Sequence, residues 1–361
     1  MRFLFVFLFF TQLVFAQENT DWYAFYNADS TLIGYKDAKG NVKIKPKFEA
    51  FMPSEIFKNV ISVIEPKNGK WEQYYLNKKG EKFGKDSVYI SDYEPANESD
   101  GKIKFRDYKT DKVGFFDFDG KVVIPALYDD ADDFHGGLAV VLKDGKRWCW
   151  DNNSEDLENC EHVGWVDFKT FMINAENEIL FEIPEQKDFS FTIDWSKFKI
   201  NEEVDSEIYT SLTGSDGNIY SFYSPEKDFN KWFEKVFIED FKTYKTVLPK
   251  YFYALVAVTD NDDPKSPTVW KNHAREEYIE KNQKEIDQIF SKIVSGEFKI
   301  TSSWRDYLKN DLYYSKNILP EEDLQNNVVI EFLPRAKGDY TLKNAFQFTK
   351  IGSDFFITSA P

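Results

Sequence analysis

Apolar and polar residues alternate in short runs over the first half of the chain, and polar turns that contain glycine separate the runs. The run IGYKDAKGNVKIKPKFEAF at Ile33–Phe51 aligns without a gap with VGFFDFDGKVVIPALYDDA at Val113–Ala131, 80 residues later. Halfway between them, YYLNKKGEKFG at Tyr74–Gly84 falls in the same frame. The turn glycines therefore recur every 40 residues, which indicates a repeat architecture; they are Gly40, Gly80 and Gly120.

Each copy has Asp or Asn at the first position of its turn and Gly at the fourth, in DAKG, NKKG and DFDG; the first-position residues are Asp37, Asn77 and Asp117. An Asx side chain at this position accepts from a backbone N–H two residues on, and Gly takes the positive φ of the bulge that follows. Apolar alternation on both sides then predicts a β-hairpin in each copy. A degenerate fourth copy is predicted from VGWVDF at Val163–Phe168, where the turn glycine is missing.

Apolar residues recur at helical spacing in the second half of the chain. The segment Pro225–Lys245 opens with Pro and acidic residues and predicts an amphipathic helix. Ser266–Ile293 carries Glu/Lys pairs on its polar face and predicts a long helix, whereas Tyr251–Thr259 fits a buried strand or a helix segment. The end of the chain alternates in three runs, which predict three strands joined by turns at Lys337–Gly338 and Gly352–Ser353.

These patterns predict a mainly β N-terminal array of β-hairpin repeats over residues 20–185, followed by an α+β domain over residues 200–361 that ends in an antiparallel meander. The repeat unit resembles the WG (KWG) repeat family of bacterial proteins. Residues 113–146 match it best, although the Trp-Gly pair occurs only in altered form, as Val113-Gly114-Phe115 and Val163-Gly164-Trp165. The resemblance implies stacked β units and carries over no catalytic residue.

A second resemblance concerns residues 225–361. The order of helices and strands, and the ending NAFQFTKIGSDFFITSA, are similar to nuclear-transport-factor-2-like domains. This resemblance implies a cone-shaped domain with a pocket between a helix and a curved sheet.

The first 20 residues, MRFLFVFLFFTQLVFAQENT, resemble an export signal. One basic residue, Arg2, precedes an apolar stretch from Phe3 to Phe15, and the small residue Ala16 then offers a cleavage point. We therefore expect residues 1–16 to be a signal peptide and the mature chain to be soluble, periplasmic or extracellular. An uncleaved anchor is the alternative, whereas a lipid anchor is not expected because no cysteine stands directly after the cleavage point, where the chain has Gln17.

The charge of the chain argues against one class of partner. Of 46 basic residues only Arg2 lies in the predicted signal, so 45 basic and 62 acidic side chains remain in the mature chain, a formal net charge of −17. Such a surface repels nucleic acid. The two cysteines, Cys149 and Cys160, are 11 residues apart, and in an exported chain they form either a disulfide or two free thiols.

Few residues of the sequence are candidates for a catalytic or metal-binding site. The run Asp129, Asp130, Asp132 and Asp133 fits either a calcium site or, as we prefer, a solvated acidic loop. The three histidines, His135, His162 and His273, match no catalytic or metal motif, and His273 is expected on a solvated helix face. The aromatic row Trp232, Phe233, Phe237 and Phe241 lines either a core or a pocket, and its helical spacing favours the core. No cofactor is indicated.

Three functions fit these observations. The first, which we favour, is an exported, non-catalytic binding or scaffold protein whose array contacts another macromolecule or a glycan. The second is a small-molecule or enzymatic pocket in the C-terminal domain, and the third is a structural component of the cell envelope. An exposed row of aromatic side chains on the array would favour the first, and a closed apolar cavity with converging polar groups the second.

Overall fold

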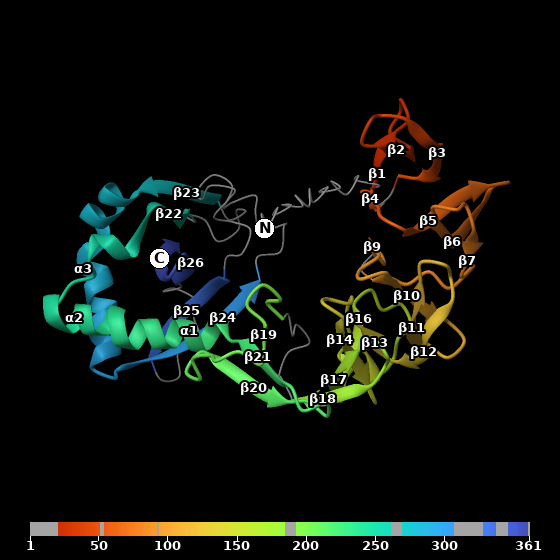
Figure 1. The fold of residues 1–361 in the computed structure, drawn as a ribbon. Coiled ribbons are helices and arrows are strands. Elements are labelled where there is room, and N and C mark those ends of the chain that lie inside the picture. The colour runs from red at the N-terminus through yellow and green to blue at the C-terminus, as the bar shows by residue number, and fades with distance from the viewer. Residues whose placement is uncertain are drawn as a thin grey trace, which may run out of the picture. The chain divides into compact units, whose positions relative to one another are not determined.

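A computed structural model describes residues 21–50, 54–91, 94–184, 193–260, 269–306, 328–336 and 346–359 (Figure 1). The predicted signal at residues 1–16 and the predicted turn at Lys337–Gly338 lie outside these ranges. The chain is mainly β, with many small antiparallel sheets. It divides into two compact units, Met1–Phe189 and Ser190–Pro361, and each unit is described by itself below.

The described residues of unit 1 include four repeats, each with a first, a second and a third strand that pair in sequence as an antiparallel meander. The strands are β1 (Trp22–Tyr26), β2 (Leu32–Asp37) and β3 (Val42–Glu49) in repeat 1; β5 (Val60–Lys67), β6 (Lys70–Asn77) and β7 (Lys82–Phe83) in repeat 2; β10 (Lys102–Asp107), β11 (Lys112–Asp117) and β12 (Val122–Tyr128) in repeat 3; and β14 (Leu138–Lys143), β17 (Lys169–Asn174) and β18 (Ile179–Ile183) in repeat 4.

Short strands complete these sheets. β4 (Ile56–Phe57) pairs with β1, and β13 (Asp130–Ala131) pairs with β14. Two further pairs stand apart from the repeat sheets: β8 (Ile90–Ser91) with β9 (Glu94–Pro95), and β15 (Lys146–Cys149) with β16 (Val163–Val166). The second of these pairs is inserted between the first and second strands of repeat 4.

The turn between the second and third strands has the same hydrogen bonds in the first three repeats. In repeat 1, the Asp37 carboxylate accepts from the backbone N–H groups of Lys39 at 3.0 Å and Asn41 at 2.8 Å. Asn77 and Asp117 accept in the same way in repeats 2 and 3. The fourth turn residue has a positive φ in each repeat, at 86°, 83° and 80° for Gly40, Gly80 and Gly120.

The fourth repeat differs from the prediction. Val163–Val166 is not its second strand, because these residues form β16 and pair with β15. The equivalent turn begins instead at Asn174, which accepts from the N–H groups of Glu176 at 3.1 Å and Glu178 at 2.8 Å. Asn177 takes the place of the glycine, with φ 69°, as Asn tolerates the left-handed region. Its side-chain oxygen also accepts from the Tyr128 hydroxyl of repeat 3 at 2.6 Å, a bond that glycine could not make.

Stacking of the repeats buries both faces of the second sheet. Neighbouring residues on a strand point to opposite faces, and Tyr74 and Tyr75 of β6 are both fully buried, at 3% and 0% exposure. Tyr74 packs in the core shared with repeat 1, and Tyr75 packs in the core shared with repeats 3 and 4. Both faces of β6 are therefore buried over its second half, Tyr74–Asn77.

Adjacent turns also contact one another. Lys79 in the turn of repeat 2 forms an ion pair with Asp119 in the turn of repeat 3 at 2.7 Å, and the Asn77 amide donates to the Phe118 carbonyl at 3.3 Å. The Phe83 ring lies directly against Gly120, where a Cβ atom would be 2.5 Å from the ring. The turns of repeats 2 and 3 are therefore part of the stacking contact.

The described residues of unit 2 form one large sheet, one small sheet and three helical segments. The small sheet has the order β19 (Lys199–Ile200), β21 (Ile219–Tyr223), β20 (Tyr209–Thr213). The large sheet has the order β23-β22-β27-β26-β25-β24, in which only the β22–β27 pair is parallel. Its strands are β22 (Phe252–Asp260), β23 (Val269–Ala274), β24 (Phe298–Asp306), β25 (Val328–Ala336), β26 (Phe346–Ile351) and β27 (Asp354–Ser359).

The helix predicted at Pro225–Lys245 is present and contains an unpredicted π-helical turn. It comprises α1 (Pro225–Trp232), the π-helical η1 (Phe233–Phe237) and α2 (Ile238–Tyr244). Four of its five buried aromatic residues recur every four residues, at Phe229, Phe233, Phe237 and Phe241, and the fifth is Trp232. A four-residue spacing drifts around a helix of 3.6 residues per turn, and one wider turn brings these side chains back to the core face.

The long helix predicted at Ser266–Ile293 is wrong in its first part. Residues Val269–Ala274 form strand β23, and α3 (Arg275–Val294) begins only after it. β23 pairs with β22 along its whole length, from Asp260↔Val269 to Leu255↔Ala274. The backbone hydrogen bonds of this pairing therefore determine that the segment is a strand, although its sequence pattern predicted a helix. A short 3-10 turn, η2 (Pro249–Tyr251), precedes β22, and Tyr251–Thr259, left open as strand or helix, is mainly strand.

The terminal meander is β25, β26 and β27, with Gly352 at φ 63° in the turn between the last two strands. The strand β24 was not predicted. Its sequence FKITSSWRD alternates only in part, and its nine-residue ladder with β25 is what defines it.

Alanine substitution at the three turn glycines should separate their two roles. Gly40→Ala and Gly80→Ala place a Cβ in open space, so only the positive φ is penalised, and each should lower the free energy of unfolding by about 1 kcal/mol. Gly120→Ala also clashes with Phe83 and should cost about 2–3 kcal/mol. Urea denaturation of the three variants measures the difference. Equal losses would contradict the contact between Phe83 and the turn.

Candidate functional site

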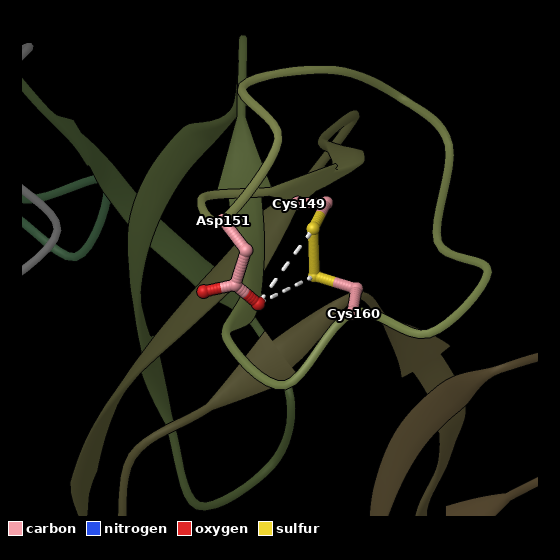
Figure 2. A group of neighbouring side chains, drawn as sticks. All are labelled: Cys149, Asp151 and Cys160. Atoms are coloured by element: carbon pink, nitrogen blue, oxygen red, sulfur yellow. Dashed lines mark hydrogen bonds between the residues drawn. A yellow bond between two sulfur atoms is a disulfide. The ribbon is translucent and has the colours of Figure 1, made fainter.

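The inserted hairpin of repeat 4 carries the cluster of polar groups that comes closest to a chemical site. Cys149 and Cys160 form a disulfide, with 5.9 Å between their Cα atoms, so the alternative of two free thiols does not hold in this structure. Cys149 ends strand β15 and is fully buried, whereas Cys160 lies in the loop that leads to β16 and is partly exposed. The bond closes this loop onto the end of the hairpin (Figure 2).

Asp151 lies beside the disulfide and organises the loop. Its Oδ2 atom accepts from the backbone N–H groups of Glu161 at 2.7 Å and His162 at 3.0 Å, and is 3.5 Å from the Cys160 sulfur. Its Oδ1 atom is 2.5 Å from Nδ1 of His162. The hydrogen bonds from the His162 side chain and backbone lower the pKa of the Asp151 carboxyl below its usual value. Asp151 is therefore held as a carboxylate next to two sulfur atoms and an imidazole.

A second network joins the inserted hairpin to repeat 3. The Asp111 carboxylate pairs with Arg106 at 2.7 Å and with Arg147 of β15 at 3.0 Å. Burial raises the pKa of Asp111, but the two guanidinium groups outweigh it and hold the pKa below its usual value. The Arg147 guanidinium also lies 4.1 Å from the centre of the Trp165 ring. These contacts hold β15 and β16 against repeat 3, and the loop that joins the two strands carries the disulfide.

The acidic run at residues 129–133 is largely engaged within the protein. Asp129 is buried; it pairs with Lys112 and accepts from the Gly145 N–H at 2.8 Å. Asp130 accepts from the Tyr89 hydroxyl at 2.7 Å, and Asp133 pairs with Lys104 at 3.1 Å. The expectation of a solvated acidic loop is therefore wrong for Asp129. Because cationic groups face Asp129 and Asp133, and Asp132 is exposed, the run does not form a converging calcium shell.

The histidines do not form one site. His162 lies beside Asp151 in the inserted loop, whereas the backbone of His135 closes a turn with Leu138 through two hydrogen bonds. His273 lies in strand β23 of unit 2, with Nδ1 3.9 Å from Glu277, and not on the helix where it was expected.

The aromatic row of unit 2 packs in the core. The side chains of Trp232, Phe233, Phe237 and Phe241 are all buried, and they belong to one cluster with side chains from β22, α3, β26 and β27. Phe237, for example, contacts Tyr251, Phe290 and Phe348. The row therefore fills the space between helix and sheet, as its helical spacing indicated.

Each of the four repeats has an exposed aromatic side chain near the connection between its first and second strands, although the position differs from repeat to repeat. One lies at or in the connection between the first and second strands of each repeat: Tyr26, Trp71, Tyr108 and Trp150, which are 53–60% exposed. Phe118 in the turn of repeat 3 is a further exposed ring of unit 1, and Tyr244 is one of unit 2. Sequence reasoning missed this recurrence because it followed the turn between the second and third strands, where the glycines are.

One partly buried glutamate joins repeats 1 and 2. Glu65 of β5 forms ion pairs with Lys47 of β3 at 3.2 Å and Lys82 of β7 at 2.8 Å, and it accepts from the Tyr74 hydroxyl. Burial raises the pKa of Glu65, but the hydrogen bonds from Lys82, Tyr74 and Lys47 outweigh it and lower the pKa to about 2.

The comparison with known families matches part of unit 1. Residues 114–146 match the family model described as "WG containing repeat". This stretch covers the second and third strands of repeat 3, the first strand of repeat 4 and the start of the inserted hairpin. It supports a WG-repeat protein and is consistent with a β-repeat binding or scaffold role. No curated protein and no solved structure matches the chain.

The pKa of Glu65 predicts a pH dependence for the stability of unit 1. A carboxyl whose pKa is lower in the folded state than its ordinary 4.5 stabilises the fold above that pH, and the stabilisation is lost as the pH falls from about 4.5 to about 2. Urea unfolding followed at about pH 6 and at about pH 3 should show this loss in the wild type. Glu65→Gln should be less stable at the higher pH and show a smaller loss.

The matched control is Glu155→Gln, which changes an exposed glutamate of the same unit. It should unfold like the wild type at both pH values. If Glu65→Gln and Glu155→Gln behave alike, the ion pairs of Glu65 do not contribute to the pH dependence.

Proposed function

We propose that this protein is an exported, non-catalytic binding or scaffold protein whose WG-like repeat array contacts another macromolecule or a glycan. The observation that carries the proposal is that each repeat has an exposed aromatic side chain near the connection between its first and second strands, at Tyr26, Trp71, Tyr108 and Trp150. Exposed rings spread along an array offer several contacts to one extended ligand. Tyr and Trp are enriched at binding surfaces because they combine a large apolar face with a polar edge.

The engagement of polar side chains within the array supports a non-catalytic role. Asp37, Asn77, Asp117 and Asn174 hold turns, Asp111 and Glu65 hold ion-pair networks, and Asp129 is buried against Lys112. The partners of Asp37, Asp111 and Glu65 hold the pKa of each of these carboxyl groups below its usual value, whereas an acid–base catalyst needs a pKa near the working pH and access to substrate. These three carboxylates thus use their charges to build the scaffold.

The pocket alternative in unit 2 has less support. The aromatic side chains that would line a pocket between helix and sheet pack against one another instead. The similarity of residues 225–361 to nuclear-transport-factor-2-like domains remains part of the proposal for unit 2; the order of its helices and six-stranded sheet supports it. In the proposed protein, unit 2 is a second folded module attached to the binding array.

Export is the second part of the proposal. The apolar N-terminal stretch with Arg2 before it and Ala16 after it supports a cleaved signal, and the disulfide in repeat 4 fits an oxidising compartment. In the part of the chain that the structure describes, no helix has the length and apolar character needed to cross a membrane. The acidic composition supports a partner other than nucleic acid.

Removing exposed rings should weaken ligand binding. We expect Tyr26→Ser and Trp71→Ser, each in the full chain, to lower the affinity for an array ligand by at least about tenfold, because central aromatic residues contribute most of the binding energy at such surfaces. The ligand is sought on a panel of immobilised glycans and in an extract of envelope proteins, and affinity is measured by surface plasmon resonance. The two sources distinguish a glycan from a protein partner.

The matched control is Tyr244→Ser, which removes an exposed ring of unit 2. Binding should be unchanged in this variant. The proposal fails if neither source yields a ligand, or if Tyr26→Ser and Trp71→Ser bind as well as the wild type.

Export predicts a defined N-terminus. When the full gene is expressed in a bacterial host with a general secretory pathway, the mature protein should begin at Gln17, and N-terminal sequencing or intact mass measures this. Recovery of the chain in the membrane fraction with Met1 intact would contradict the cleaved signal and support the anchor.

A further inference from the structure

Three side chains with metal-binding donor atoms meet in the inserted loop of repeat 4, and a fourth contacts one of them. The sulfur atoms of Cys149 and Cys160 and a carboxylate oxygen of Asp151 all lie within 4.8 Å of one another, and no other such group of three occurs among the described residues. Figure 2 shows Asp151 pointing at the disulfide. The imidazole of His162 joins the group through its contact of 2.5 Å with Asp151.

We propose that reduction of the Cys149–Cys160 disulfide converts this loop into a binding site for a zinc-type divalent cation, held by Cys149, Cys160, Asp151 and His162. The disulfide and the metal site are alternative states of the same residues. The oxidised protein keeps the disulfide, and the metal binds only after a dithiol reductant has reached the loop.

The chemistry of the change balances. A dithiol gives two electrons and two protons to the sulfur–sulfur bond, which breaks to leave two cysteine thiols, while the reductant becomes a cyclic disulfide. The cation then displaces the two thiol protons and bonds to both thiolates, since the thiolate is the form that binds metal. The positive charge is neutralised by the two thiolates, and Asp151 adds a third negative ligand.

The types of donor favour zinc over harder ions. Two thiolates, one imidazole and one carboxylate form a four-ligand set of the kind that tetrahedral zinc sites use, whereas calcium and magnesium prefer oxygen atoms alone. In such a site each sulfur atom bonds the cation at about 2.3 Å, and the two sulfur atoms occupy separate corners of a tetrahedron. They must therefore separate from each other before both can bind the cation.

The placement of the two cysteines allows this movement. Cys149 is anchored at the end of β15, where it pairs with Val163, but Cys160 lies in the loop outside the strands. Each cysteine is followed two residues later by a further donor, Asp151 after Cys149 and His162 after Cys160. Cys149 and Asp151 therefore come from the start of the loop, and Cys160 and His162 from its end. One bound cation can thus hold the two ends of the loop together in place of the disulfide.

The position of Asp151 is already fixed before metal arrives. Its Oδ2 atom is held by the backbone N–H groups of Glu161 and His162, and such supporting hydrogen bonds orient ligands in metal sites. The partly exposed Cys160 sulfur gives a reductant access to the bond. Reduction thus frees two ligands beside a third that is already oriented.

Cobalt(II) is the probe for the test, because thiolate-bound tetrahedral cobalt gives charge-transfer and ligand-field absorption bands. The full chain is reduced with a phosphine, which does not supply competing thiols, and titrated with cobalt and then zinc. We expect stoichiometric thiolate–cobalt absorption in the reduced wild type, its loss when zinc is added, and none in the oxidised protein.

Variants identify the ligands. Cys149→Ser and Cys160→Ser should abolish the thiolate–cobalt bands, and His162→Ala should weaken cobalt binding by at least about tenfold. Asp151→Asn should also weaken it, and because the amide can still accept the backbone hydrogen bonds, circular dichroism should remain that of the wild type. The control His135→Ala changes an exposed histidine of the same unit outside the loop and should bind cobalt like the wild type.

Two outcomes would overturn the proposal. One is a reduced wild type that gives no thiolate–cobalt bands although thiol titration shows both cysteines free. The other is a reduced wild type whose cobalt affinity is matched by His162→Ala and Asp151→Asn, which would show that the thiols bind without the other two ligands.

Discussion

The array depends on the burial of both faces of a sheet that is only three strands wide. A small antiparallel sheet has too little apolar surface on one face to be stable alone, and repeat 2 solves this by contributing Tyr74 to one core and Tyr75 to the other. Every repeat is therefore stable only with its neighbours, as in other solenoid-like proteins. The turns take part in the same contact, since Lys79, Asp119 and Phe83 join the turns of repeats 2 and 3.

The local elements of the array could be predicted from the sequence because they rest on short-range rules. An Asx side chain and a glycine three residues later form the turn by themselves, and the turns at Asp37, Asn77 and Asp117 have the hydrogen bonds that this pattern implies. The fourth turn escaped the same rule because Asn177 replaces the glycine and its bonding to Tyr128 is a contact between repeats. The sequence of a single repeat cannot predict this bond, because its two partners lie in different repeats.

The errors in unit 2 and in the acidic run have the same origin. β23 carries a sequence that a helix would accept, and its pairing with β22 decides its conformation. The sequence predicted a solvated Asp129, but Lys112, 17 residues earlier, forms an ion pair with it in the fold. The exposed rings at Tyr26, Trp71 and Tyr108 could have been found in the sequence only by aligning the connection between first and second strands. That connection varies in length and composition more than the glycine turn does.

The insertion in repeat 4 shows where such an array can acquire new parts. The ladder between β14 and β17 runs without interruption from Leu138↔Asn174 to Lys143↔Lys169, so the inserted segment leaves and re-enters the sheet at two paired residues. The sheet therefore closes across the gap whatever lies between those residues. The connection between first and second strands is thus a grafting position, at which evolution or an engineer can exchange a loop without changing the core of any repeat.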